Sequence, residues 1–146
     1  MWITTAKDGF IMTLGRDSGH NSHNFVFSVS NGYLSFWDYN NGYGFNTACQ
    51  TQLVNTGART HVAFAKSGST GIYYINGSPT CTVTSSLSST SYTNVALCVG
   101  KDCRNNNNFF TGKMDSIQIF SAQLSASQIH YLGGRLHSLP IHISIQ

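Results

Sequence analysis

The sequence contains few charged residues. Only 9% of its 146 residues are charged, against about 25% in ordinary soluble domains. All five acids are aspartates, so glutamate is absent. The net charge is +3, and the basic residues are scattered from Lys7 to Arg135. Nucleic-acid binding normally needs a clustered basic patch, so the composition argues against that class of function.

Long apolar runs are also absent. No stretch approaches the roughly 20 residues that a membrane-spanning helix requires. Residues 1–3 enter a strand-like segment at once, without the basic start and apolar stretch of a secretory signal. Gly, Ser, Thr and Asn are abundant instead, which is typical of a sheet protein rich in turns.

The even number of cysteines favours an exported, disulfide-bonded domain. Neither a CxxC motif nor a zinc-like Cys/His spacing is present. Four cysteines allow three pairings, and four free thiols are a further alternative. A 98–103 bridge needs a turn at 100–102, because five extended steps separate the Cα atoms by about 16 Å and a bridge tolerates about 7 Å. An 81–98 bridge would close a loop worth about 3 kcal/mol. The cysteines are Cys49, Cys81, Cys98 and Cys103.

One short motif points to the same extracellular setting. Asn76-Gly77-Ser78 is an N-glycosylation acceptor on an expected turn, although Pro79 directly after it disfavours modification.

Strand signals recur about every ten residues, separated by Gly/Asn/Ser clusters, which predicts a β-sandwich or barrel. Asn31-Gly32 and Asn76-Gly77 are strong hairpin-turn signals. No internal repeat or domain boundary is evident. The expected strands include 24–30, 32–39, 60–66, 71–75, 94–100 and 113–120.

The last part of the chain predicts a strand followed closely by a helix. Residues 113–120 alternate with period two, as in a half-buried strand. Ser125 and Gln128 have the spacing of a capping box. The helix is expected to end near Leu132, because Gly133-Gly134 follows.

These motifs resemble the laminin-G-like jelly roll of the concanavalin A-like lectin/glucanase superfamily. Arg59-Thr60-His61-Val62-Ala63 is similar to the family's Trp-x-His-Val-Ala, with Arg59 as a departure. Tyr74-Ile75-Asn76-Gly77 and Leu97-Cys98-Val99-Gly100 are similar to a hairpin and a strand of the family. The closing signature stands as Phe110, Gly112, Met114, Asp115, Ile117, Ile119, Phe120, Leu124, Ser125 and Ile129.

The resemblance implies an all-β, two-sheet antiparallel jelly-roll sandwich with one short C-terminal helix. The domain is expected over 1–132, and the tail 133–146 is a candidate for an extra edge strand because Ile141, Ile143 and Ile145 alternate. The first strands of the family would lie before Met1. They would come from another chain, be replaced by the tail, or be absent from a partial sequence. An open sheet edge invites strand addition and self-assembly.

The resemblance also implies roles for two residues. The strand at 113–120 would close one sheet, with the helix over an end of the sandwich. Asp115 is expected at the core rim, accepting backbone N–H bonds in a structural role. His61 is expected as a packed residue at the rim of the core.

Catalysis is not expected. The superfamily's glucanases use a Glu-x-Asp-x-x-Glu strand, since retaining hydrolysis needs two carboxyl groups about 5 Å apart. Without glutamate, and with no two aspartates two to four residues apart, that motif is absent. No nucleophile-elbow motif accompanies the six histidines.

The favoured function is a non-catalytic, extracellular carbohydrate-binding or adhesion module with a glycan or extracellular protein as partner. With Leu34 and Phe36 facing the core, the aromatic residues of the same strand fall on its other face. The alternative is a structural subunit or surface module of an extracellular assembly, in which a neighbour covers that face. The predicted ligand-binding residues are Tyr33, Trp37, Asp38, Tyr39 and Asn106.

Calcium is a candidate cofactor, because relatives of this fold often hold one at the sheet rim. Calcium takes carboxylate and carbonyl oxygens. Asp17 and Asp102 are the candidate ligands, and solvated turn acids are the alternative for both.

Overall fold

The computed structural model describes residues 1–15, 23–40, 43–84, 96–103 and 107–134. For residues 23–24, 38–40 and 43–47 only the backbone is described.

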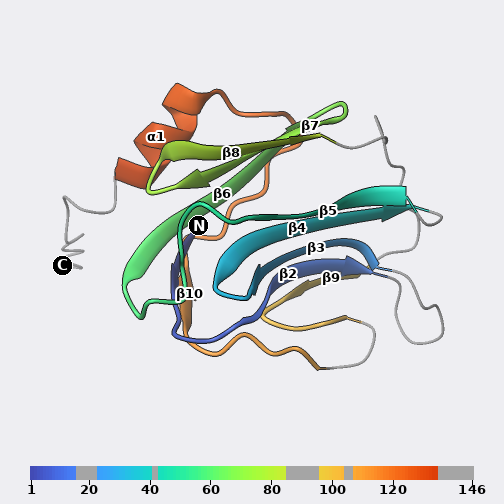
Figure 1. Ribbon diagram of the computed structural model, residues 1–146, viewed down its shortest axis with the longest axis vertical. Helices are drawn as coiled ribbons and strands as arrows, with labels where there is room; N and C mark the ends of the chain where they lie inside the picture. The colour runs from blue at the N-terminus through green and yellow to red at the C-terminus, as the bar shows by residue number, and fades with distance from the viewer. Residues whose placement is uncertain (16–22, 41–42, 85–95, 104–106, 135–146) are drawn as a thin grey trace, which may run out of the picture.

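The chain forms two antiparallel five-stranded sheets and one short helix, consistent with a jelly-roll sandwich (Figure 1). The first sheet has the order β10-β1-β6-β7-β8 and the second β5-β4-β3-β2-β9. The elements are β1 (Trp2–Thr4), β2 (Gly9–Gly15), β3 (His23–Ser30), β4 (Tyr33–Asn40), β5 (Tyr43–Cys49), β6 (Arg59–Ser67), β7 (Thr70–Ile75), β8 (Ser78–Thr84), β9 (Ala96–Val99), β10 (Lys113–Asp115) and α1 (Ala126–Gly134).

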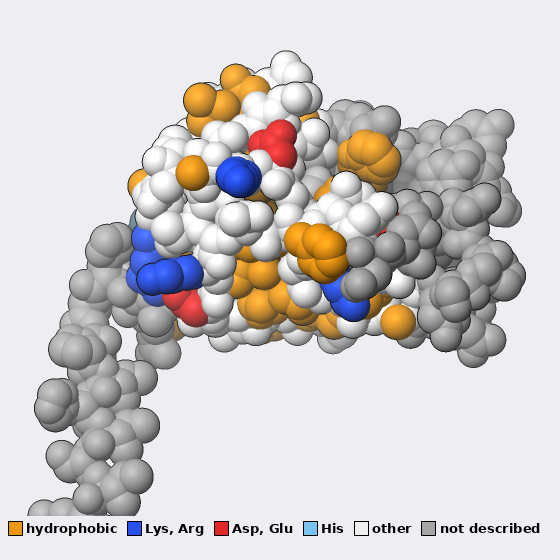
Figure 2. All heavy atoms as spheres, turned by 90° about the horizontal axis from the view of Figure 1, so that it is seen from below, with side chains coloured by type: hydrophobic (Ala, Val, Ile, Leu, Met, Phe, Trp, Pro, Cys, Tyr) orange, Lys and Arg blue, Asp and Glu red, His pale blue; other side chains and the backbone are white. Residues whose placement is uncertain are grey.

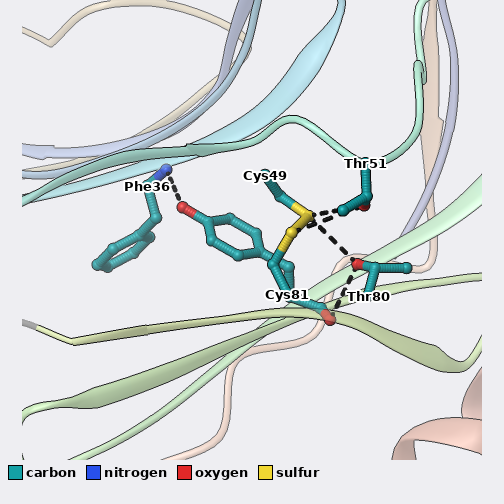
Figure 3. Close-up of a disulfide and its surroundings, with 6 residues drawn as sticks. Phe36, Cys49, Thr51, Thr80 and Cys81 are labelled. Atoms are coloured by element: carbon teal, nitrogen blue, oxygen red, sulfur yellow. Dashed lines mark hydrogen bonds between the residues drawn. A yellow bond between two sulfur atoms is a disulfide. The ribbon is translucent and has the colours of Figure 1, made fainter.

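The core lies between the two sheets. Ile11 and Leu34 of the second sheet pack with Val62 and Tyr73 of the first, and all four side chains are fully buried. The Tyr73 hydroxyl accepts a hydrogen bond of 2.7 Å from the Phe36 backbone N–H, which satisfies a polar group inside the sandwich (Figure 3). The two sheets are therefore joined by a buried polar contact as well as by apolar packing.

Two disulfides are present, and the described chain has no free cysteine. Cys49, the last residue of β5, is bonded to Cys81 of β8, so this bridge connects one sheet to the other (Figure 3). Cys98–Cys103 closes a turn after β9, and Gly100 within it has φ +76°. The turn predicted for this pairing is confirmed, whereas the 81–98 alternative and the free-thiol alternative are wrong.

Both predicted Asn-Gly hairpins are confirmed. Asn31 and Gly32 have φ of 51° and 83°, and Asn76 and Gly77 have 51° and 79°. Positive φ at both central residues is what a type I′ turn requires, and Asn and Gly tolerate it best.

The strand predicted at 113–120 is wrong beyond Asp115. Ser116 has φ +51°, which interrupts the extended backbone, and residues 116–124 form no described strand. Ile117, Ile119 and Phe120 are consequently 38%, 60% and 49% exposed. Alternation of apolar and polar residues predicts a strand, but it does not show whether a neighbouring strand is available to pair with this segment.

The capping box at the start of α1 is confirmed. The Ser125 N–H donates to Gln128 Oε1 at 2.8 Å, and the Gln128 N–H donates to Ser125 Oγ at 3.3 Å. The helix continues through Gly133 to Gly134, past the predicted end. A Cβ on Gly133 would lie 2.9 Å from the Gly77 backbone, so this glycine permits close packing of α1 rather than ending it.

Arg59, the departure from the family pattern, takes part in a stacked ion pair. Its guanidinium carbon lies 4.3 Å from the centroid of the Trp2 ring, and its Nη2 lies 3.0 Å from Asp115 Oδ2. Asp115 is half-exposed and its carboxylate accepts from the Arg59 guanidinium, instead of lying at the core rim with backbone N–H groups as predicted; the contact is still a structural one. Partial burial raises the pKa of Asp115, but the hydrogen bonds from Arg59 and Ser116 outweigh this effect, so the pKa lies below its ordinary value.

Candidate functional site

Trp37 lies on the outer face of the second sheet. Along β4, Leu34 is fully buried in the core, whereas the Trp37 side chain is 44% exposed. Its indole Nε1–H donates to Ser35 Oγ at 3.1 Å. Since Ser35 lies two residues earlier on the same face, this bond holds the ring along the sheet surface.

The segment 100–110 brings distant residues to this face. The Thr13 hydroxyl of β2 donates to the Lys101 carbonyl at 3.0 Å and lies 3.3 Å from the Cys103 N–H. The Phe10 N–H then donates to the Asn108 carbonyl at 3.0 Å. With the Cys98–Cys103 bridge, these bonds place Asn108 and the following residue beside β2.

Together these residues form a groove of about 310 Å³, here called the Trp37 groove. This volume is at the lower end of those of small-ligand pockets. Trp37 and Phe109 are the half-exposed aromatic residues of the groove, at 44% and 56%. The groove is lined by Asp8, Gly9, Phe10, Ser28, Val29, Ser30, Trp37, Asn108 and Phe109.

Asp8 is the acidic residue of the groove, but the adjacent hairpin uses its carboxylate. The Asn31 and Gly32 N–H groups donate to its two oxygens, and Asn55 Nδ2 lies 3.4 Å from Oδ1. Asp8 thus fixes the turn between β3 and β4. The other polar side chains of the groove are uncharged hydroxyls and an amide.

Of the predicted ligand-binding residues, the structure describes the side chains of Tyr33 and Trp37, and their ligand-binding role stays a prediction. Tyr33 is half-buried on β4 and does not line the Trp37 groove. Asp38 and Tyr39 belong to β4, but their side chains lie outside the described residues, as does Asn106. Trp37 is placed as predicted, on the face opposite Leu34.

Sequence reasoning missed Phe109 as a groove residue and, within the neighbouring asparagines, singled out Asn106 rather than Asn108. The predicted residue Asn106 pointed to this loop, but the loop's position beside β2 depends on the turn closed by Cys98–Cys103 and on the Phe10–Asn108 bond. The hydrogen bond joins segments that are far apart in the sequence, whereas the disulfide closes a turn between cysteines five residues apart. Only a correct pairing of the cysteines would have indicated that this loop turns back onto the sheet.

The described residues do not fit a calcium site. Asp102 is fully buried rather than at a solvated rim, and its N–H donates to the Asn107 carbonyl. In the described part of the chain, no three His, Cys, Asp or Glu side chains come together as metal ligands would. Asp17 lies outside the described residues.

Two further residues are placed on the opposite sheet. Asn76 is exposed, and its side-chain oxygen accepts a bond of 3.0 Å from the His61 N–H. Its glycosylation remains a prediction. His61 is 3% exposed, as expected for a packed residue, and burial lowers its pKa to about 4.

Charge is sparse over the molecule. On the face shown in Figure 2, hydrophobic side chains gather near the centre, and Lys and Arg form no continuous basic patch. The described residues also include no helix of the length and apolarity needed to cross a membrane.

Comparison with known proteins agrees with this architecture. A laminin G family model, described as the concanavalin A-like lectin/glucanases superfamily, matches residues 1–130. The chain belongs to this superfamily. The sequence resemblance and the predicted jelly-roll sandwich are therefore confirmed. A search of curated proteins found no match.

A solved structure is also similar to this concanavalin A-like domain. It is the crystal structure of residues 221–444 of an S-layer domain-containing protein from Clostridium thermocellum, with 27% sequence identity and a TM-score of 0.45. The match covers 89% of this chain and 64% of that one, so the present chain spans less than two thirds of its length.

Proposed function

We propose that this domain is a non-catalytic carbohydrate-binding module of an extracellular or cell-surface protein. The observation that carries the proposal is the Trp37 groove, where two half-exposed aromatic rings flank hydroxyl and amide groups. A sugar ring offers an apolar C–H face and a rim of hydroxyls, so it needs both kinds of contact. Membership of a superfamily that includes lectins supports the same assignment.

The lining of the groove favours an uncharged sugar. The Asp8 oxygens already accept bonds from the hairpin, so this carboxylate has little capacity left for a ligand. Ser30 and Asn108 offer a hydroxyl that donates or accepts and an amide that does both, whereas Ser28 is buried at the base of the groove. Trp37, held by Ser35, would stack on the sugar ring with little loss of side-chain entropy.

The aspartates support a non-catalytic assignment. Retaining glycoside hydrolysis needs two carboxyl groups about 5 Å apart. Asp8 caps a hairpin, Asp102 is buried, and Asp115 is paired with Arg59. With glutamate absent from the sequence, the described residues offer no acid and nucleophile pair.

The two disulfides support placement outside the cell, because such bridges persist mainly in oxidising compartments. A second candidate function, as a structural module in a surface assembly, is favoured by the exposed Ile117, Ile119 and Phe120. Apolar side chains exposed together mark interaction sites. Adhesion through this surface would not require sugar binding.

A glycan array on the purified chain tests the proposal. The lectin assignment predicts binding to neutral glycans that is lost in Trp37→Ala and kept in Tyr131→Ala. Tyr131 is a matched control because it is a comparably exposed aromatic residue on α1 that does not line the Trp37 groove. A blank array from folded protein, together with self-association in sedimentation experiments, would favour the assembly function instead.

A further inference from the structure

The Trp37 groove crosses the strands of the second sheet instead of following one of them. Its lining residues come from β2 and the residue just before it, from β3, from β4 and from the segment that contains Asn108 and Phe109. In the sheet order, β3 lies between β4 and β2 (Figure 1). The groove therefore has one half-exposed aromatic residue at each end, Trp37 on β4 and Phe109 beyond β2.

The pairing register defines the floor of the groove. Ser35 of β4 is opposite Ser28 of β3, and Ser28 is opposite Phe10 of β2. The Phe10 N–H donates to the Asn108 carbonyl, which continues the line to the next segment. These four residues form a row perpendicular to the strands, because hydrogen bonds between antiparallel neighbours run in that direction.

Both ends of this row are held in place. The Trp37 indole is hydrogen-bonded to a serine of its own strand, which keeps the ring at the β4 end. At the other end, the Phe110 N–H donates to the carbonyl of Gly100, directly after β9, so the segment lies on the side of β2 away from β3. Gly9 permits this close approach, because a Cβ there would lie 2.7 Å from the Phe109 carbonyl oxygen.

The length of the row exceeds what one sugar ring can bridge. Three interstrand spacings of about 4.8 Å separate β4 from the segment with Phe109, or roughly 14 Å in all. A ring that touches two aromatic faces at once needs them about 7–8 Å apart, since carbon atoms meet at about 3.5–4.0 Å. A chain of sugars can contact both ends of the groove, whereas a single sugar contacts one of them.

We propose that the Trp37 groove binds two or three consecutive neutral sugar residues of an oligosaccharide, which lies across the strands with one ring on Trp37 and another on Phe109. This inference rests on the proposed function and adds the length and direction of the ligand. Ser30 and Asn108 line the groove with a hydroxyl and an amide that can bond to the hydroxyl rim of the sugars. Phe10, half-buried in the row, adds apolar surface beneath them.

Titration with neutral oligosaccharides of increasing length tests the proposal. The probes are cello-, malto-, laminari-, manno- and chito-oligosaccharides of two to five residues and the methyl glycoside of each sugar, measured by isothermal titration calorimetry on the full chain. Affinity should rise about tenfold from one residue to three, where the second ring is engaged, and then level off. Binding that does not depend on length would overturn this inference and leave the proposed function intact. Absence of binding by every probe, together with a blank glycan array, would contradict the proposed function itself.

The variant Phe109→Ala identifies the far end of the site. Saturation-transfer NMR of the bound trisaccharide should show signals from both terminal residues in the wild type and from one of them in Phe109→Ala. The same variant should lower trisaccharide affinity about tenfold and leave that of the methyl glycoside, which stacks on Trp37, unchanged. Tyr131→Ala removes a comparably exposed ring outside the groove and should change neither measurement. Retention of both terminal signals in Phe109→Ala, or equal loss of both, would overturn the proposal.

Discussion

The indole of Trp37 is hydrogen-bonded to Ser35 Oγ at 3.1 Å, so this half-exposed ring is fixed by a residue of its own strand. Ser35→Ala removes this bond without removing the ring. A typical hydrogen bond contributes about 0.5–1.5 kcal/mol, so glycan affinity should fall roughly two- to tenfold, less than in Trp37→Ala. Isothermal titration calorimetry with an array-selected glycan measures both. Equal losses in the two variants would contradict the positioning role of Ser35.

The two disulfides should differ in their effects: loss of Cys49–Cys81 should mainly lower stability, and loss of Cys98–Cys103 should mainly lower glycan affinity. The Cys49–Cys81 bridge spans 32 residues and joins the sheets, whereas Cys98–Cys103 spans five. The chain-entropy relation gives about 4 and about 2 kcal/mol for these loops. Replacing each pair by serine should therefore lower the free energy of unfolding more for the 49/81 pair, measured by denaturant titration.

Glycan affinity should show the opposite order for the same variants. The 98/103 pair holds the segment that carries Asn108 and Phe109, whereas the 49/81 bridge lies at the other edge of the sheet. The affinity of the folded 98/103 variant is expected to fall at least tenfold. An unchanged affinity would show that this segment does not contribute to the site.

The close approach of α1 to the Asn76-Gly77 turn can be tested with two adjacent glycines. A Cβ on Gly133 would lie 2.9 Å from Gly77 backbone atoms, while a Cβ on Gly134 would meet nothing within 4 Å. Gly133→Ala should destabilise the fold by about 1–3 kcal/mol, since an overpacked site must shift. Gly134→Ala should be neutral or stabilising, because alanine is the better helix former. Thermal unfolding compares the two, and equal effects would refute the packing argument.

Burial of His61 should make stability depend on pH. Its folded-state pKa of about 4 lies below the unfolded value of 6.5, so the unfolded chain binds the proton more strongly between these values. The contribution of neutral His61 to the free energy of unfolding is fully present above pH 6.5 and is lost as the pH falls towards 4. The total loss is about 2–3 kcal/mol.

Denaturant titrations at pH 7 and pH 4.5 measure this loss. His61→Asn should reduce the difference between the two pH values, and His130→Gln, at an exposed position of α1, should not. If both variants retain the full pH dependence, His61 is not its source.

Arg59 should contribute more through Trp2 than through Asp115. The ion pair is about half-exposed on both sides, and such pairs contribute about 0–1 kcal/mol. Stacking on Trp2, which is 2% exposed, adds about 0.5–1 kcal/mol. Arg59→Ala is thus expected to lower the unfolding free energy by about 1 kcal/mol, more than Asp115→Asn does. The reverse order in urea titrations would contradict this assignment.

The features that the sequence predicted correctly are local. The Asn-Gly turns, the capping box at Ser125 and the outward face of Trp37 each depend on residues within a few positions of one another. Such signals are carried by backbone preference and by the alternation of a strand.

The features that the sequence did not predict depend on contacts between distant segments. The strand at 113–120 stops at Asp115, because alternation cannot supply a neighbouring strand. The sequence predicts that Gly133 ends the helix, whereas its role is close packing against Gly77 in the turn between β7 and β8. Phe109 lies in the Trp37 groove beside β2, where the bond between Phe10 and Asn108 joins two segments far apart in the sequence.

The most direct test of the proposed function uses the fluorescence of Trp37 itself. The chain has two tryptophans, and Trp2 is 2% exposed while Trp37 is 44% exposed. Acrylamide therefore quenches mainly Trp37. If a neutral glycan stacks on this ring, adding the array-selected glycan should reduce quenching in the wild type and have no effect in Trp37→Phe. Unchanged quenching at a glycan concentration that saturates binding would contradict the account, because the sugar would then be bound elsewhere.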